Sequence, residues 1–187
     1  QAAKLLAEAG FADHDGDGLL DKDGQPFRFE LSLPSTTPPA LEAGNNWFQE
    51  QLQRAGVEMS MRVVDSKQLF QVDLPQHKFA AAEMSWLGDP CDDDLYERFH
   101  SAAIEQGRNY AGYRSSECDR LIEAWRGEFD RGRRLELARE LGRRLNEDQP
   151  VTFLFNPQSL VLVTVKLRNV QMHRLGARWH DWWFGAD

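Results

Sequence analysis

A loop near the start of the chain has the residue spacing of a calcium-binding loop. Its oxygen-bearing members are Asp13, Asp15, Asp17, the Leu19 carbonyl and Asp21. These residues reproduce the first nine positions of such a loop, in which oxygen ligands surround the ion. The twelfth position normally supplies a bidentate glutamate but is Gly24 here, which predicts weak binding at best. The other interpretation is a turn whose aspartates accept local backbone hydrogen bonds. The first interpretation implies a calcium-stabilised structural or adhesive module.

The common catalytic motifs are absent from the sequence. The five histidines are His14, His77, His100, His173 and His180. None of them belongs to the HExxH motif of a zinc protease, and there is neither a Gly-x-Ser-x-Gly elbow nor a glycine-rich phosphate loop. Two carboxylates acting as acid and base would need a geometry that spacing alone does not supply. We therefore expect a binding module and not an enzyme.

The composition restricts the partners. A chain of 187 residues, 41% of them hydrophobic, is large enough for one core. Its 30 acidic and 22 basic residues leave a net charge of −8, which repels phosphate backbones and argues against nucleic acid. No apolar run approaches the roughly 20 residues of a membrane span. Cys91 and Cys118 match no zinc spacing, and whether they pair stays open.

The elements that must position any site begin with a strand, a helix and a second strand. Residues 27–33 alternate apolar and polar side chains, which predicts a strand. Residues 40–56 place apolar residues at helical spacing and end on a glycine, which predicts a helix. Residues 57–63 alternate again. A helix of crossover length between two strands predicts a right-handed βαβ unit with parallel strands, so the fold class is α/β.

The later elements are mostly helical. Residues 78–86 predict a third strand, and helices are expected from residue 115 and, capped by Asp130, in the segment that follows. The apolar stripe of the second helix consists of Leu135, Ala138, Leu141 and Leu145. Residues 152–156 and 160–165 are β-rich, and the second run is apolar enough to be buried on both faces of a sheet.

The order of these segments resembles the large C-terminal lobe of the extracellular solute-binding proteins of family 5, which carry oligopeptides, dipeptides and nickel chelates for ABC importers. The stretches that carry the likeness are Leu5–Phe11, the Asp13–Gly24 loop, Trp86–Asp89, Asn109–Tyr113 and Cys118–Ile122. The resemblance implies a periplasmic binding protein-like (type II) lobe, with a mixed sheet, parallel βαβ units and flanking helices. Residues 1–187 would form this single C-terminal lobe of a larger two-lobed protein. The start at Gln1, without an initiator methionine, also leads us to expect a piece of a longer chain.

The resemblance further implies a ligand contact at Asp89. In peptide-binding members of the family, the aspartate of this tryptophan-to-aspartate loop receives the α-ammonium group of the ligand. An ammonium group taken out of water needs such an anion, because an unpaired buried charge is very costly. The alternative is that Asp89 only stabilises the turn before Pro90. Trp86 and Tyr110 are expected to add apolar and aromatic wall to the site, with packing in the core as their alternative.

The same resemblance implies the partners and the location. The cargo would be a peptide or a related small solute, held between this lobe and the missing N-terminal lobe. The loaded protein would dock on the transmembrane permease subunits of an ABC importer. It would be periplasmic or extracellular, and any membrane anchor would lie in the absent N-terminus. No resident cofactor is expected apart from calcium in the first interpretation of the Asp13 loop.

Overall fold

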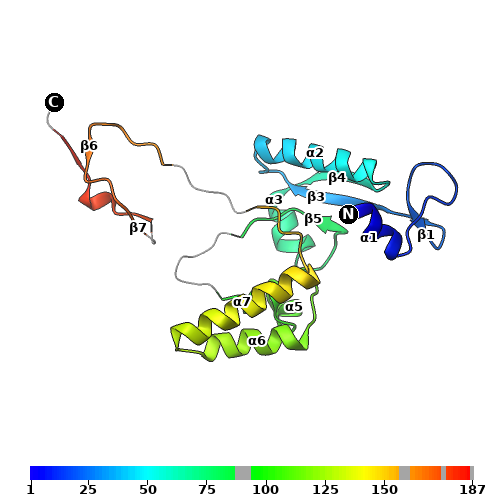
Figure 1. Ribbon diagram of the computed structural model, residues 1–187. Coiled ribbons are helices and arrows are strands. Elements are labelled where there is room, and N and C mark those ends of the chain that lie inside the picture. The colour runs from blue at the N-terminus through cyan, green and yellow to red at the C-terminus, as the bar shows by residue number, and fades with distance from the viewer. Residues whose placement is uncertain (87–93, 156–160, 174–175, 186–187) are drawn as a thin grey trace. The chain divides into compact units, whose positions relative to one another are not determined.

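The computed structural model describes residues 1–86, 94–155, 161–173 and 176–185 (Figure 1). The chain divides into two compact units, of which the first comprises Gln1–Ser85 with Glu105–Gly112 and the second Trp86–Ile104 with Tyr113–Asp187. Each unit contains a cluster of buried apolar side chains of its own. The short helix α5 (Ala103–Gln106) lies where the chain passes from the second unit back to the first.

The first unit is built around a parallel three-stranded sheet. Its strands are β3 (Arg28–Pro34), β4 (Glu58–Val64) and β5 (Ala81–Ala82), in the order β4-β3-β5. β3 and β4 are joined by α2 (Pro39–Arg54), which runs alongside both strands in Figure 1. The predicted strand, helix and parallel strand are therefore confirmed, and the fold is α/β. The third strand is much shorter than the predicted 78–86, because only its two alanines pair with β3.

The two faces of this sheet differ because the side chains alternate along each strand. One face carries Phe29, Leu31 and Leu33 of β3 beside Met59, Met61 and Val63 of β4. Two polar contacts join α2 to Met59 and Glu83. The Gln49 amide donates to the Met59 carbonyl at 2.6 Å, and the buried Asn45 amide donates to the Glu83 carboxylate. The opposite face carries charged side chains over most of its length, with the Arg62 guanidinium 2.6 Å from the Glu30 carboxylate, and ends at the buried Val64.

A capped turn and a π-helix follow β4 and form the core of the first unit. The Asp65 carboxylate accepts hydrogen bonds from two backbone N–H groups of α3 (Ser66–Gln68), and the π-helix η1 (Leu69–Asp73) continues from it. Val64, Leu69 and Leu74 are buried together, with the less buried Phe79, Ala82, Met84 and Tyr110 packed around them. The sheet and the π-helix are thus held by one apolar cluster.

The N-terminal segment reaches the sheet through a glycine contact. It consists of α1 (Ala2–Glu8), the Asp13 loop, and an antiparallel pair formed by β1 (Asp21–Lys22) and β2 (Gln25–Pro26). The Leu20 N–H donates to the Gly56 carbonyl at 2.7 Å. Gly56 has a φ of +79°, and a Cβ atom at this position would lie 2.7 Å from the Leu20 side chain. Only glycine therefore permits this approach without rearrangement.

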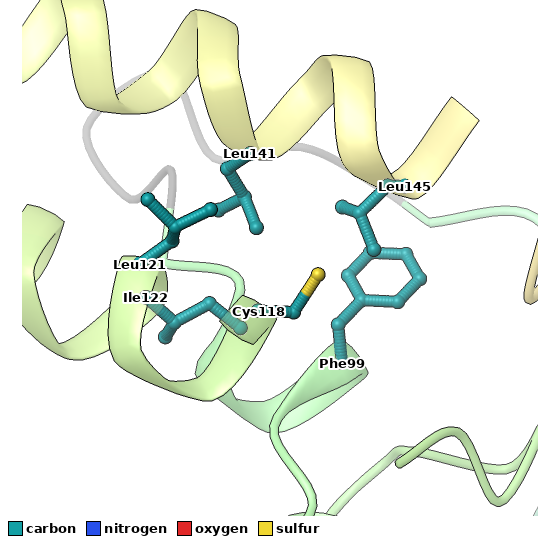
Figure 2. Packing of buried hydrophobic residues seen from close by; sticks show 6 residues of the cluster. All are labelled: Phe99, Cys118, Leu121, Ile122, Leu141 and Leu145. Atoms are coloured by element: carbon teal, nitrogen blue, oxygen red, sulfur yellow. The ribbon is translucent and has the colours of Figure 1, made fainter. Parts of the chain in front are cut away.

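The second unit contains a helical hairpin with an apolar core. Its main helices are α6 (Ser116–Gly127) and α7 (Arg131–Asp148), with the single-turn α4 (Tyr96–Phe99) beside them. In Figure 2, two leucines of α7 point toward α6 and Phe99 of α4. The buried members of this core are Phe99, Cys118, Leu121, Ile122, Leu141 and Leu145. Asp130 caps α7 as predicted, by accepting from the Arg133 N–H at 2.9 Å.

The end of the described chain forms two short antiparallel pairs. β6 (Leu167–Arg168) pairs with β9 (Trp183–Phe184), β7 (Met172–His173) pairs with β8 (Gly176–Ala177), and the 3₁₀ turn η2 (Trp179–Asp181) lies between β8 and β9. The two β-rich runs before them do not become strands in their described parts, residues 152–155 and 161–165, and most of their large apolar side chains are exposed. Over the parts of the chain that the structure covers, no helix has the length and apolar character that a membrane crossing requires.

Candidate ligand-binding site

Asp89, the predicted contact for a ligand ammonium group, lies in residues 87–93, outside the described residues. Cys91 lies in the same segment, so the question of its pairing with Cys118 stays open as well. The role of Asp89 therefore remains a prediction. The residue just before this segment, Trp86, is described.

The Trp86 ring is fixed by contacts within the second unit. It lies edge to face against the Phe99 ring, with 5.8 Å between the two ring centroids. The Arg98 guanidinium lies 5.5 Å from the centroid of the Trp86 ring. Such aromatic and cation–π contacts add to the gain from burying the ring. The buried Trp86 Nε1–H has no hydrogen-bond partner among the described residues. A buried indole N–H usually has one. What the described contacts establish for Trp86 is the packing of its ring.

Tyr110 is held at both its ring and its backbone in the first unit. The ring packs against the cluster of Val64, Leu69 and Leu74. Its carbonyl oxygen accepts a hydrogen bond from the imidazole of His77, with 2.9 Å between Nδ1 and the oxygen. Both Trp86 and Tyr110 therefore contribute to packing, the alternative that the sequence left open for each. Their further role as walls of a ligand site remains a prediction.

The aspartates of the Asp13 loop do converge. Carboxylate oxygens of Asp13, Asp15 and Asp17 all lie within 4.8 Å of one another, and all three residues are exposed. Carboxylates at this spacing are chemically suited to a hard cation such as Ca²⁺. Asp21 was predicted as a further ligand, but its carboxylate accepts hydrogen bonds from both the backbone N–H and the ring of His14, at 3.1 and 2.9 Å. The backbone bond from His14 is the main reason that the pKa of Asp21 is lowered.

The same three carboxylates also accept hydrogen bonds from the loop backbone. Asp13 accepts from the N–H groups of Gly16 and Gly18 at 2.7 and 3.0 Å. Asp17 accepts from the Leu19 N–H at 2.8 Å, and Asp15 accepts from the Asp17 N–H at 3.2 Å. These bonds form the aspartate-rich turn of the second interpretation. Calcium binding, for which the Leu19 carbonyl was a predicted ligand, remains a prediction.

A polar cluster in the second unit escaped the sequence analysis. The Tyr113 hydroxyl donates to the Asp148 carboxylate at 2.5 Å and lies 3.1 Å from the buried Cys118 sulfur. Burial, followed by the bond to Asp148, raises the pKa of Tyr113 well above its ordinary value of 10.0. Tyr113 precedes α6, Cys118 lies in the first turn of α6 and Asp148 is the last residue of α7, so no short motif could have joined them. Asp148 also pairs with Arg144 of α7. The cluster therefore stabilises the hairpin.

The chain matches a known family and is similar to several known proteins. A family model described as bacterial extracellular solute-binding proteins, family 5 Middle, matches residues 1–105. The oligopeptide-binding protein AppA of Bacillus subtilis is 33% identical over 174 residues, which are 92% of this chain and 32% of AppA. An uncharacterised Escherichia coli protein, YejA, is 31% identical over 126 residues, which are 65% of this chain and 20% of YejA. This chain thus spans about a third or less of the length of these relatives.

Solved structures of similar proteins give the same result. The structure of Bacillus subtilis AppA in complex with a nonapeptide matches with a TM-score of 0.79 and 30% identity, over 98% of this chain and 37% of AppA. The structure of Campylobacter jejuni NikZ in complex with Ni(L-His) matches with a TM-score of 0.72 over 96% of this chain and 38% of NikZ. NikZ is only 20% identical, so its likeness concerns the fold alone. The type II periplasmic binding protein fold that the sequence predicted is confirmed.

Proposed function

Because the chain belongs to the bacterial extracellular solute-binding proteins of family 5, we propose that it is part of the substrate-binding component of an ABC importer. Residues 1–187 form the C-terminal ligand-binding lobe of a two-lobed protein, and the cargo is a peptide or a related small solute. Closure of the second lobe over the first traps the cargo by a hinge motion. The observation that carries this proposal is the likeness to an oligopeptide-binding protein over 92% of the chain.

In this proposal Asp89 receives the α-ammonium group of a bound peptide. A charge-assisted hydrogen bond at this point sets the register of the peptide, whose other side chains can then vary. The structural support is the ring of Trp86, three residues earlier in the sequence, which is held by Phe99 and Arg98. Trp86 and Tyr110 each offer aromatic surface to the ligand in this proposal.

The rest of the proposal concerns partners and location. The loaded protein docks on the transmembrane permease subunits of the importer, and it makes and breaks no covalent bond, so it is not an enzyme. The family itself is extracellular. A membrane anchor, where one is present, belongs to the part of the protein that precedes this lobe.

The calcium-stabilised structural or adhesive module, which the Asp13 loop suggested as an alternative function, is not supported. The proteins that resemble this chain are solute-binding proteins. The carboxylates of Asp13, Asp15 and Asp17 already accept hydrogen bonds from the loop backbone, which accounts for the aspartates without a metal-dependent function.

The test compares Asp89→Asn with the wild-type two-lobed protein by isothermal titration, using a pool of short peptides with either free or acetylated amino termini. Loss of one partner of a desolvated charge pair costs about 2–5 kcal/mol. The wild type should therefore prefer free amino termini by that amount, and Asp89→Asn should lose the preference. The matched control is the neighbouring Asp92→Asn, which should keep it. An equal preference in wild type and Asp89→Asn would contradict the role of Asp89, and no binding of any peptide by the wild type would contradict the peptide proposal.

A further inference from the structure

His77 lies in an unusual stretch of backbone. It follows the π-helix η1 by four residues, and its φ of +51° is in the left-handed region that residues other than glycine rarely adopt. Two local hydrogen bonds hold this turn, from the His77 N–H to the Leu74 carbonyl at 3.1 Å and from the Lys78 N–H to the Asp73 carbonyl at 2.8 Å. A rare conformation of this kind persists where the surrounding structure determines it. Its effect here is to aim an exposed imidazole at a segment far away in the sequence.

That segment contains Tyr110. The His77 Nδ1 atom lies 2.9 Å from the Tyr110 carbonyl oxygen, across 33 positions of the chain. A carbonyl oxygen can only accept, so the donor must be Nδ1–H. In the neutral ring the proton is therefore on Nδ1, and Nε2 carries none. This hydrogen bond links the turn after η1 to the segment Glu105–Gly112, which returns to the first unit.

The bond completes the support of Tyr110 from a second direction. The Tyr110 ring is already packed on the Val64, Leu69 and Leu74 cluster. Beside it, Asn109 is fully buried, and its carbonyl accepts from the Gly112 N–H at 3.0 Å in a tight turn. The ring contact restrains the side chain and the His77 bond restrains the peptide unit. Together they define both the place and the direction of the tyrosine, which a site built to sub-ångström tolerance requires.

We propose that His77 is a positioning residue for the ligand site: its Nδ1–H holds the Tyr110 carbonyl and thereby sets the Tyr110 ring in place. This inference rests on the proposed function, in which Tyr110 lines the peptide site. His77 itself contacts no ligand in this scheme. Its contribution to affinity comes from limiting the motion of Tyr110 before the ligand arrives, because preorganisation reduces the cost of ordering on binding.

Two substitutions separate the hydrogen bond from the unusual backbone. His77→Asn keeps a donor on an atom bonded to Cγ, as Nδ1 is, and asparagine tolerates a positive φ. His77→Gly adopts the positive φ freely but has no donor. In the two-lobed protein we expect His77→Gly to weaken binding of a tight peptide from the pool about fivefold, the effect of one neutral hydrogen bond. His77→Asn should stay within about twofold of the wild type, and so should the exposed neighbour Gln76→Ala.

Non-additivity shows whether His77 acts through Tyr110. If it does, the double variant His77→Gly with Tyr110→Ala binds no more weakly than Tyr110→Ala alone. Hydrogen exchange should also be faster at the amides of 109–112 in His77→Gly and near the wild-type rate in His77→Asn. Two results would overturn the positioning role and leave the proposed function intact. One is that the losses of peptide affinity add in the double variant. The other is that His77→Gly binds peptide as tightly as the wild type although Tyr110→Ala binds it more weakly.

A spectroscopic measurement gives a result that does not depend on ligand. The ¹⁵N chemical shifts of the His77 ring distinguish the two neutral tautomers, and we expect the proton on Nδ1. A proton on Nε2 in the neutral ring would refute the hydrogen bond itself. A different result would be a proton on Nδ1 together with no change of peptide affinity in Tyr110→Ala or Asp89→Asn. The hydrogen bond would then be present, but the proposed ligand site would be wrong, and the positioning role with it.

Discussion

At the scale of single residues, the hydroxyl of Tyr113 makes a polar contact that joins the two helices of the hairpin. It donates to the Asp148 carboxylate near the C-terminus of α7 while lying beside Cys118 in the first turn of α6. Asp148 also pairs with Arg144, with 3.2 Å between the charged atoms. One phenol thus joins the two helices at the end opposite their connecting turn, in a position where water is partly excluded.

The substitution Tyr113→Phe should lower the free energy of unfolding by about 1–2 kcal/mol, the usual range for a partly buried hydrogen bond to a charged group. It should also change the response to alkali. Because the pKa of Tyr113 is raised in the folded state, the unfolded chain loses this proton first, and stability falls as the pH rises above the ordinary value of 10.0. Urea unfolding at pH 8 and pH 10.5 should show a larger loss in the wild type than in Tyr113→Phe. Tyr96→Phe is the control, and an identical loss in all three proteins would contradict the expectation.

The Asp13 loop shows how far a residue pattern can be interpreted without coordinates. The spacing of Asp13, Asp15 and Asp17 correctly predicted that their carboxylates meet. The spacing could not decide whether these carboxylates bind an ion or accept hydrogen bonds from the backbone. Carboxylate oxygens on a tight, glycine-rich turn suit both. The local N–H groups supply the contacts that the structure shows. The contact between His77 and Tyr110 could not be predicted, since 33 residues separate them.

At the scale of elements, local periodicity predicted most of what forms. β3, α2 and β4 match the predicted strand, helix and strand to within a few residues, because the spacing of apolar residues in each segment is that of the element it forms. The α7 helix begins after Asp130 as predicted, yet its predicted buried stripe was partly wrong. Leu141 and Leu145 are buried, whereas Leu135 is 49% exposed. Leu135 is not among the side chains that pack on the Phe99 cluster. Helical spacing alone does not show which apolar positions of a helix face its partner.

This difference along one helix predicts a matched pair of variants. Leu141→Ala removes a side chain that is 1% exposed and should lower the free energy of unfolding by about 2–5 kcal/mol, through lost burial and the cavity that remains. Leu135→Ala makes the same chemical change at a half-exposed position and should cost less than about 1 kcal/mol. Chemical unfolding of both variants, followed by far-ultraviolet circular dichroism, checks the order. Equal losses would mean that the hairpin core of Figure 2 is not the packed unit of this region.

The β-rich runs illustrate what local pattern cannot supply. Residues 152–156 and 160–165 were predicted as strands, and the second as buried on both faces. In their described parts neither forms a strand, and Leu162 and Val165 are 86% and 88% exposed. Strand formation needs a partner strand, because an extended segment satisfies no hydrogen bonds by itself. A sequence pattern therefore reports the preference of such a segment without showing whether its partner is present. The same reasoning explains why β5 is limited to the two residues that face β3.

At the scale of the whole molecule, the exposed apolar side chains and the greater length of the relative both indicate that further residues cover the β-rich runs. Phe153, Leu154 and Phe155 are between 52% and 64% exposed, and the second run adds further exposed aliphatic residues. Contiguous apolar surface of this kind is normally covered in a stable protein. The oligopeptide-binding relative is about three times as long, since the match covers only 32% of it. In the proposed two-lobed protein, the remaining two thirds are therefore available to cover these runs.

This view predicts that residues 1–187 by themselves bind an environment-sensitive dye such as anilinonaphthalene sulfonate, and self-associate as concentration rises, because uncovered apolar β-rich segments attract one another. The double substitution Leu162→Thr with Val165→Thr should reduce dye fluorescence and association without lowering the melting temperature, since both side chains are already exposed in this chain. In the two-lobed protein the same substitutions should lower the melting temperature, because there we expect the side chains to be covered.

The matched control is Phe129→Thr on the helical hairpin, where the original side chain is 95% exposed. This substitution should leave the melting temperature of both proteins unchanged. If the Leu162 and Val165 substitutions leave the melting temperature of the two-lobed protein unchanged, these runs are uncovered there too. That result would contradict their proposed burial by the rest of the protein.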